Sequence, residues 1–258
     1  MSSSLDLRSV LEFALDTAWQ AGRITLGYFQ TGIVPERKSD ESPVTAADKA
    51  AEQKIRELTT RYWPDDGIIG EEFGNHTGTS GYTWTVDPID GTKSFVQGVP
   101  IYSVLLSLTD GKRPLVGVVH FPALNETVYA TQGGGCYWNG RRTQVSSVAT
   151  VRDSVLLASD IDAFDKYNRA APWKRLVDST YFQRTWGDSY GYALVATGRA
   201  EIMVDPWMAI WDCGPLQVVL EEAGGTFTDW NGNPTIYAGE AIATNGKVFD
   251  EVMGLVRG

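Results

Sequence analysis

The stretch that decides the fold is YTWTVDPIDGTKSFVQG, residues 82–98. Its first five residues are mostly aromatic and β-branched and predict a strand. The predicted strand stops at Asp87 and Asp90, two carboxylates with a stiffening proline between them. Gly91 and Thr92 then open a predicted helix. The sequence therefore predicts a strand, an acidic turn and a helix in immediate succession.

This acidic turn carries groups suited to a metal ion and a phosphate side by side. Asp87 and Asp90 can converge beyond the strand end, and two carboxylates that close repel each other unless a cation lies between them. The backbone N–H groups of Gly91 and Thr92, at a helix start, offer a small anion site. The alternative is a solvated acidic turn, which is what most D-x-x-D spacings represent.

Two further acids are expected at the same place. Glu71 follows a short β-rich run at 67–70, and Asp212 lies at the start of a helix predicted near 211–223. Clustered Asp and Glu oxygens select hard cations such as Mg²⁺. Each acid also has a simpler interpretation, Glu71 as a surface charge and Asp212 as an ordinary helix N-cap.

Composition narrows the function classes. The 258 residues carry 22 basic and 32 acidic side chains, a formal charge of −10 that argues against a nucleic-acid or anionic-membrane partner. Cys136 and Cys213 cannot form a disulfide framework, so we expect two core thiols. His76 and His120 lack zinc-motif spacing, and we expect structural or surface roles. Acids interrupt the N-terminal apolar residues and no run of about 18 apolar residues occurs, so we expect a cytoplasmic protein without a membrane span.

The first half, expected over 1–148, combines two helices with a sheet. An apolar stripe at spacings of three and four predicts a helix over 5–29, and a polar loop follows at 36–43. Thr45, with Asp48 three residues later, has capping-box spacing and starts a second helix that should end at a Trp-Pro pair. Short β-rich runs favour an antiparallel sheet packed on these helices. They lie at 67–70, 82–86, 102–108, 115–121 and 127–131.

The second half, expected over 149–258, alternates strand and helix, which is typical of an α/β unit. The expected strands lie near 154–159, 181–185 and 201–204, and the expected helices near 164–178, 188–198 and 211–223. Pro172 lies within the helix expected at 164–178, where a proline is unfavourable. No flexible linker separates the halves, so we expect them to pack closely.

Together these motifs resemble the inositol monophosphatase superfamily of Mg²⁺-dependent, lithium-sensitive phosphatases over nearly the whole chain. The matching motifs, in the family's order and spacing, are Val44-Thr45-x-x-Asp48, Gly70-Glu71-Glu72, Asp87-Pro-Ile-Asp90-Gly91-Thr92 and Trp211-Asp212 followed by Glu222-Ala-Gly-Gly225. The resemblance implies an α/β (α+β) layered sandwich of alternating helix and sheet layers, with the site between the halves. A homodimer is one assembly it allows. The non-enzyme alternative, a metal-binding regulatory relative, predicts a broken ligand set, whereas every expected ligand is present.

The resemblance also implies a site for two or three Mg²⁺ ions. Glu71, Asp87 and the Ile89 carbonyl would hold the first ion. Asp87, Asp90 and Asp212 would hold the second, and Glu71 with waters a weaker third. Metal ions of this kind activate water and stabilise the leaving alkoxide, so no phosphoenzyme is required.

Further roles follow from the same resemblance. Thr92 and Asp48 would orient and deprotonate the attacking water. The N–H groups of Gly91 and Thr92 would bind the phosphate oxygens. Lys38, between the two helices, matches a lysine of a mobile loop near the third metal.

Substrate choice is expected in the second half. The runs GDSYGY at 187–192 and MVDP at 203–206 look like the histidinol-phosphate phosphatase branch of the family. Asp188 and Asp205 would pair with the ammonium and imidazole of histidinol phosphate. Arg184, one of the few basic residues expected near the pocket, is a third substrate-binding candidate.

We therefore expect hydrolysis of the small phosphate monoester L-histidinol phosphate to L-histidinol and phosphate, in histidine biosynthesis. An inositol-1-phosphate, or a broader set of sugar or nucleotide phosphates, is the alternative substrate. Asp188 also has a simpler interpretation, as a cap of the helix expected at 188–198.

Overall fold

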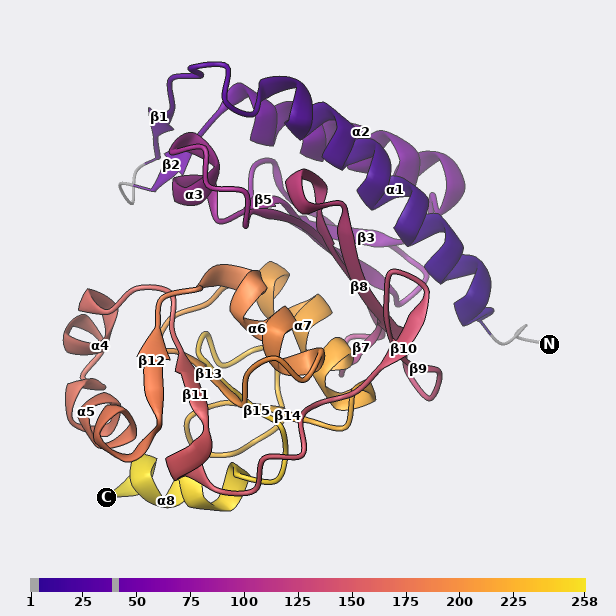
Figure 1. The fold of residues 1–258 in the computed structure, drawn as a ribbon. Coiled ribbons are helices and arrows are strands. Elements are labelled where there is room, and N and C mark those ends of the chain that lie inside the picture. The colour runs from indigo at the N-terminus through magenta and orange to yellow at the C-terminus, as the bar shows by residue number, and fades with distance from the viewer. Residues whose placement is uncertain (1–4, 39–41) are drawn as a thin grey trace.

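Helices and sheets alternate in layers in the computed structural model, which describes residues 5–38 and 42–258 (Figure 1). The outer face of an eight-stranded sheet is covered by α1 (Leu7–Tyr28) and α2 (Ala46–Tyr62). Between this sheet and a five-stranded one lie α6 (Asp188–Ala196) and α7 (Ile210–Glu222). The far face of the second sheet is covered by α4 (Asp162–Lys166), α5 (Ala170–Ser179) and α8 (Phe249–Arg257). The predicted layered sandwich is confirmed.

The first sheet is antiparallel except at one pair of its described strands. Across the sheet the order is β10-β9-β8-β7-β6-β5-β3-β4, and β3 and β5 run parallel. The bounds are β3 (Gly67–Gly70), β4 (Gly74–His76), β5 (Thr83–Asp90), β6 (Ser103–Thr109), β7 (Pro114–Phe121), β8 (Glu126–Thr131), β9 (Gly135–Trp138) and β10 (Arg141–Thr143). The five predicted strands are confirmed, but the sequence did not predict β4, β9 and β10.

Both N-terminal helices form for the reasons that their sequences indicate. The apolar stripe of α1 is buried, with Val10, Ala14 and Ala18 fully inaccessible. At the start of α2 the capping box is present, because Thr45 N–H donates to Asp48 Oδ2 at 2.7 Å and Ala47 N–H donates to Thr45 Oγ1 at 3.1 Å. A short pair of strands, β1 (Glu36–Arg37) and β2 (Pro43–Val44), lies between the helices. Residues 39–41 of the predicted loop at 36–43 lie outside the described residues.

The second sheet has the order β12-β11-β13-β15-β14, with β11 parallel to both β12 and β13. Its strands are β11 (Val155–Leu157), β12 (Phe182–Arg184), β13 (Ile202–Asp205), β14 (Thr226–Thr228) and β15 (Ala241–Thr244). The sequence did not predict β14, β15 and α8. Shorter helices complete the chain: α3 (Thr92–Val96) and the 3₁₀ turns Pro122–Leu124 and Val151–Asp153.

The single helix expected at 164–178 is wrong. The segment forms α4 and α5, which are separated at Asn168, a residue in the left-handed region with φ +59°. Pro172 is not the cause of the break. It is the third residue of α5, where its missing N–H would have no partner within the helix.

The central helix α7 packs closely on the first sheet because a glycine stands on each side of the contact. Gly117 of β7 faces α7, and Gly214 of α7 faces the sheet. A Cβ atom at Gly117 of β7 would lie 2.5 Å from Val218 Cγ1 and 2.6 Å from the Pro215 carbonyl. A Cβ atom at Gly214 of α7 would lie 2.6 Å from Thr85 Oγ1. Helices α6 and α7 therefore join both sheets in one core, and the division near residue 148 stays a prediction.

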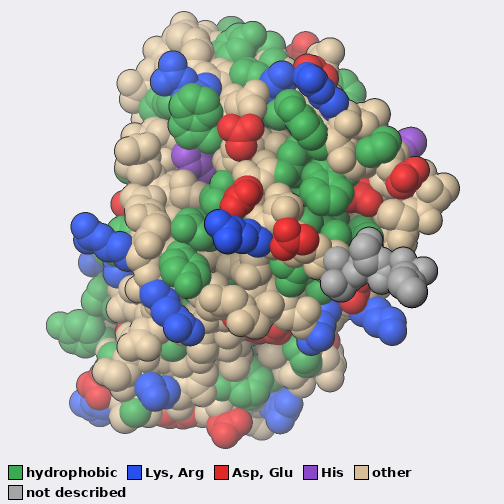
Figure 2. Space-filling model, turned by 90° about the vertical axis from the view of Figure 1, so that its right-hand side faces the viewer, with side chains coloured by type: hydrophobic (Ala, Val, Ile, Leu, Met, Phe, Trp, Pro, Cys, Tyr) green, Lys and Arg blue, Asp and Glu red, His purple; other side chains and the backbone are tan. Residues whose placement is uncertain are grey.

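The structure also shows where the cysteines, the histidines and the charged surface residues lie. Cys136 and Cys213 are buried free thiols. His76 is exposed on β4, while His120 is buried with Nδ1 2.8 Å from Thr127 Oγ1, and burial lowers the pKa of His120 to about 4. No described helix has the length and apolar character needed to cross a bilayer. On the face shown in Figure 2, Lys and Arg side chains are interspersed with Asp and Glu.

We predict that Gly117→Ala destabilises the protein by about 1–3 kcal/mol, because the added methyl group overpacks the contact between β7 and α7. Gly27→Ala, at a helical position with nothing within 4 Å of the added Cβ, should be neutral or stabilising by up to about 1 kcal/mol. Urea denaturation of both variants measures the difference. Equal stabilities would contradict the close approach.

Candidate active site

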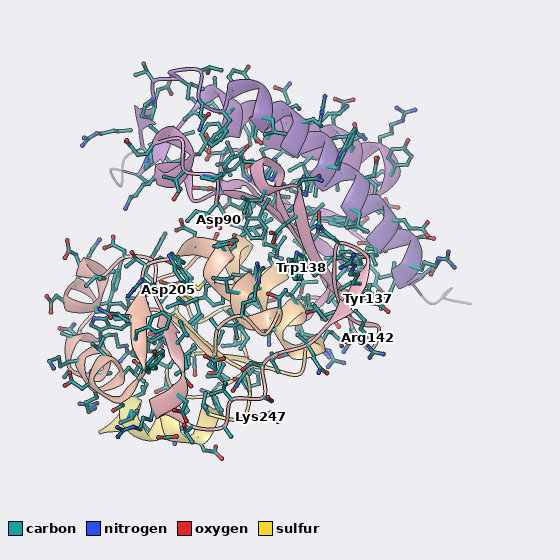
Figure 3. The ribbon with its side chains drawn as sticks, in the orientation of Figure 1. Asp90, Tyr137, Trp138, Arg142, Asp205 and Lys247 are labelled. Atoms are coloured by element: carbon teal, nitrogen blue, oxygen red, sulfur yellow. The ribbon has the colours of Figure 1, made fainter. Side chains whose placement is uncertain are left out.

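The site lies at the carboxyl end of β5, where the strand becomes irregular. Asp87 pairs with Leu105 and Asp90 with Ser103 of β6, and the register shifts between the two acids, so they flank an irregularity in the ladder. Gly91, in the left-handed region at φ +79°, turns the chain directly into α3. Figure 3 shows Asp90 on the first half and Asp205 on the second, on the sides where the halves face each other.

Three carboxylates converge at this point. Asp87, Asp90 and Asp212 each offer an oxygen, and the three oxygens lie within 4.8 Å of one another. Each side chain is aimed by a backbone N–H: that of Ile89 donates to Asp87 Oδ1 (2.9 Å), that of Ser189 to Asp90 Oδ2 (2.8 Å) and that of Ala209 to Asp212 Oδ2 (2.9 Å). The cluster therefore joins β5, its bulge and α7. Asp212 is the third residue of α7 and bonds its N-cap, so the interpretation of Asp212 as the N-cap itself is wrong.

The electrostatics of the cluster favour a cation. Burial and the neighbouring acids raise the pKa of Asp87 well above its ordinary value, that of Asp90 to about 7 and that of Asp212 to about 8. Within residues 5–38 and 42–258, none of these three carboxylates takes part in an ion pair, whereas the neighbouring Glu71 is paired with Lys38. An all-oxygen donor set with unbalanced charge fits a hard divalent metal ion.

Glu71 lies beside the cluster, and its carboxylate forms an ion pair with Lys38. Its N–H donates to the Val86 carbonyl at 3.2 Å, which holds it against β5, and its charge raises the pKa of Asp87. Lys38 Nζ lies 2.7 Å from both Glu71 Oε1 and Glu72 Oε1. The Glu71 side chain is 19% exposed, so it is not simply a surface charge.

Asp48 and Thr92 meet as the resemblance implied. Thr92 Oγ1 lies 3.4 Å from Asp48 Oδ1 and donates to the Ile89 carbonyl at 3.0 Å. Asp48 is fully buried, and burial raises its pKa although Thr45 donates two hydrogen bonds to it. A buried carboxylate beside a hydroxyl, at the edge of the acidic cluster, has the character of a general base.

Asp188 faces the Gly91–Thr92 turn from the second half. A Cβ atom at Gly91 would lie 2.8 Å from Asp188 Oδ2. Asp188 itself has φ +54°, a conformation that side chains rarely adopt. The N-cap of α6 is Gly187 and has no side-chain bond, so the capping interpretation of Asp188 is wrong.

The other two substrate candidates have different surroundings. Asp205 is buried, and its oxygens accept hydrogen bonds from Ser159 N–H (3.1 Å) and from the hydroxyl groups of Ser159 (3.1 Å) and Tyr192 (3.0 Å). Arg184 is exposed at the end of β12, where it donates to the Gln183 carbonyl at 2.7 Å and lies over the Phe182 ring. Neither has an ion-pair partner among the described residues.

Sequence reasoning missed two residues that support the site. Ser189 is buried and its N–H aims Asp90, but only the packing of α6 reveals this. Glu52 is buried on α2 beneath the turn that carries Glu71. The available signal for Glu52 was its position four residues after Asp48, on the buried face of the same helix.

Comparison with known proteins agrees with this geometry. The model of the inositol monophosphatase family matches residues 6–256. A histidinol-phosphatase of Chlorobaculum parvum is 40% identical over 235 residues, 91% of each chain, and one of Mycobacterium tuberculosis is 38% identical over 253 residues, 96% of each chain. A solved IMPase structure from Thermotoga maritima has a TM-score of 0.86 at 30% identity and covers 96% of this chain and 97% of its own.

We predict that the metal-free protein loses stability as the pH rises from 6.5 to 8.5. Asp90 and Asp212, with pKa values of about 7 and about 8 in the folded state, hold protons that they release on unfolding, since an unfolded Asp has a pKa near 4, so rising pH favours unfolding. His120 acts in the opposite direction only below about pH 6.5. Melting temperatures in EDTA should therefore be lower at pH 8.5, and Asp212→Asn should reduce the difference. The same melting temperature at both values would contradict the buried charge.

Proposed function

Because the chain belongs to the inositol monophosphatase family and is a phosphoric monoester hydrolase, we propose that it hydrolyses L-histidinol phosphate with Mg²⁺ as its metal. The observation that carries the substrate proposal is the carboxylate of Asp188 beside Gly91. In histidinol phosphate the ammonium is on the carbon next to the phosphate ester, so an acid beside the phosphate site suits this substrate.

The metal assignment rests on the chemistry of the donor set. Asp87, Asp90 and Asp212 would hold one ion, while Asp87, Glu71 and the Ile89 carbonyl would hold another. Mg²⁺ supplies charge neutralisation for the phosphate and lowers the pKa of bound water. The convergence of one buried and two partly buried carboxylates supports this assignment, because it is costly without a cation.

The remaining roles fall to residues around Asp48. The Thr92 hydroxyl orients the attacking water, and Asp48 accepts its proton through Thr92. The N–H groups of Gly91 and Thr92 bind phosphate oxygens. Lys38 is paired with Glu71 and balances the charge of its carboxylate. Glu71 with waters would hold a weaker third ion.

On the substrate side, Asp188 pairs with the ammonium of histidinol phosphate. Burial, and after it the charge of the neighbouring Asp205, raise the pKa of Asp188 to about 6. Arg184, exposed at the end of β12, remains a third substrate-binding candidate. We place the reaction in histidine biosynthesis in the cytoplasm and propose a homodimer as the assembly.

The alternative substrate is an inositol monophosphate. The relative from Thermotoga maritima, 31% identical over 250 residues, is named fructose-1,6-bisphosphatase/inositol-1-monophosphatase. A cyclitol is neutral apart from its phosphate, so it gains nothing from Asp188.

A panel assay separates these substrates. We predict Mg²⁺-dependent phosphate release from histidinol phosphate, with kcat/KM at least about tenfold above that for inositol-1-phosphate, because one charged hydrogen bond contributes about 1.5–3 kcal/mol. Asp87→Asn should abolish turnover of both and excludes a contaminating phosphatase. Equal rates on the two substrates would refute the substrate proposal, and no turnover on either would refute the Mg²⁺ phosphatase.

Asp188→Asn tests the proposed role of that residue. Asparagine tolerates a positive φ, so the backbone should be preserved. We predict that KM for histidinol phosphate rises about tenfold to a hundredfold, while KM for inositol-1-phosphate changes by less than about threefold. Parallel changes for both substrates would mean that Asp188 serves the phosphate site in general.

A further inference from the structure

Helix α2 presents a second buried acid, Glu52, one turn after Asp48. The Glu52 side chain has no exposed surface, which is rare for a glutamate. It touches neither the Gly91–Thr92 turn nor Asp87, Asp90 or Asp212 in any described contact. Its partners lie instead in the hairpin turn 71–73 between β3 and β4.

Every described polar contact of the Glu52 carboxylate concerns that turn or its neighbour Arg56. Oε2 accepts the Glu72 N–H at 2.7 Å, and Oε1 accepts the Phe73 N–H at 3.2 Å. Arg56 Nε lies 2.7 Å from Oε1 and compensates the buried charge. The carboxylate therefore satisfies two consecutive backbone donors that the turn itself leaves unpaired.

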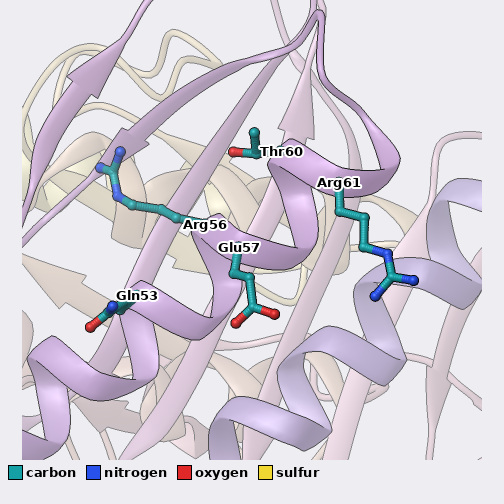
Figure 4. A pocket seen from close by; sticks show the side chains of 5 residues that line it. All are labelled: Gln53, Arg56, Glu57, Thr60 and Arg61. Atoms are coloured by element: carbon teal, nitrogen blue, oxygen red, sulfur yellow. The ribbon is translucent and has the colours of Figure 1, made fainter.

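The surroundings of Glu52 leave it little freedom. A Cβ atom at Gly70, the last residue of β3, would collide with Glu52 Oε1 and Arg56 Nη2. Arg56 also donates to the Gly74 carbonyl on the far side of the turn. Figure 4 shows that the side chains of Arg56 and Arg61 leave α2 in different directions, and both line a surface depression together with Gln53, Glu57 and Thr60.

The turn held in this way carries Glu71 at its first position. Glu71 is fixed on one side by its bond to Val86 in β5, and its neighbours Glu72 and Phe73 are fixed by Glu52. The same helix places Asp48 next to Thr92. Thus α2 sets the distance between the turn of Glu71 and the segment that follows β5.

We propose that Glu52 is a positioning residue for Glu71 and thereby sets the affinity of the site for Mg²⁺. This inference rests on the proposed function, in which Glu71 is a metal ligand. Residues that orient metal ligands typically change metal affinity about tenfold to a hundredfold when replaced. A purely structural buried acid would change stability but not metal affinity.

The test compares Glu52→Gln with Glu201→Gln. The amide keeps the size of the side chain but turns an N–H group toward a backbone donor, so it cannot serve both Glu72 and Phe73. Glu201 is a matched control: it is 5% exposed, accepts the Val155 N–H at 2.8 Å and lies at the start of β13. Both variants therefore lose a buried carboxylate that accepts a backbone hydrogen bond.

Two quantities are measured in each variant: the dissociation constant of Mg²⁺ from calorimetric titration, and the Mg²⁺ concentration that gives half-maximal phosphate release. For Glu52→Gln we predict that both rise about tenfold to a hundredfold, with kcat at saturating Mg²⁺ within about threefold of the wild type. For Glu201→Gln both should stay unchanged. A Glu52→Gln protein that folds and binds Mg²⁺ like the wild type would overturn the proposal.

Gly70→Ala decides the matter if Glu52→Gln does not fold. Its methyl group displaces the Glu52 carboxylate without removing the charge, so it should weaken Mg²⁺ binding in the same direction. Unchanged Mg²⁺ binding in Gly70→Ala would then refute the role of Glu52. A wild-type protein that binds no Mg²⁺ would instead refute the metal assignment under the proposed function.

Discussion

Repulsion among the carboxylates of Asp87, which is buried, and of Asp90 and Asp212, which are partly buried, is the constraint on which the rest of the structure depends. Each acid is fixed by a backbone N–H, so the group cannot relax by turning away from its neighbours. Burial weakens the screening that would make such a cluster tolerable in water. The cluster is thus unfavourable for the folded state on its own, and a bound cation would offset this cost. Part of the formal charge of −10 therefore lies in this acidic cluster.

The site exists only where the layers meet, since no single element supplies it. β5 brings two of the acids, α7 brings the third, and α6 aims Asp90 through the N–H of Ser189. The glycines at the contact between α7 and the first sheet let Asp212 approach the strand end. On the outer side, α2 holds Asp48 against Thr92. Packing of helices on both faces of one sheet therefore determines the geometry of the acids.

Sequence reasoning recovers the features that depend on neighbouring residues. The Thr45–Asp48 capping box forms because its partners are three residues apart, and the strand before Asp87 is recognisable from its own composition. Glu52 was missed because its partners come from a hairpin turn about twenty residues away, and no local pattern shows that the turn will reach α2. The break at Asn168 was missed because one left-handed residue is enough to end a helix. The meeting of acids from both halves was implied by the family resemblance, not by spacing.

The central claim is that the carboxylates of β5 and α7 converge in order to hold divalent metal. Anomalous scattering from crystals grown with Mn²⁺ in place of Mg²⁺ tests it most directly, because it locates the ions without reference to activity. The account predicts a strong Mn²⁺ peak bounded by Asp87, Asp90 and Asp212, and a second one toward Glu71. Crystals that hold Mn²⁺ only elsewhere, or none at a concentration well above that needed for phosphate release, would contradict it.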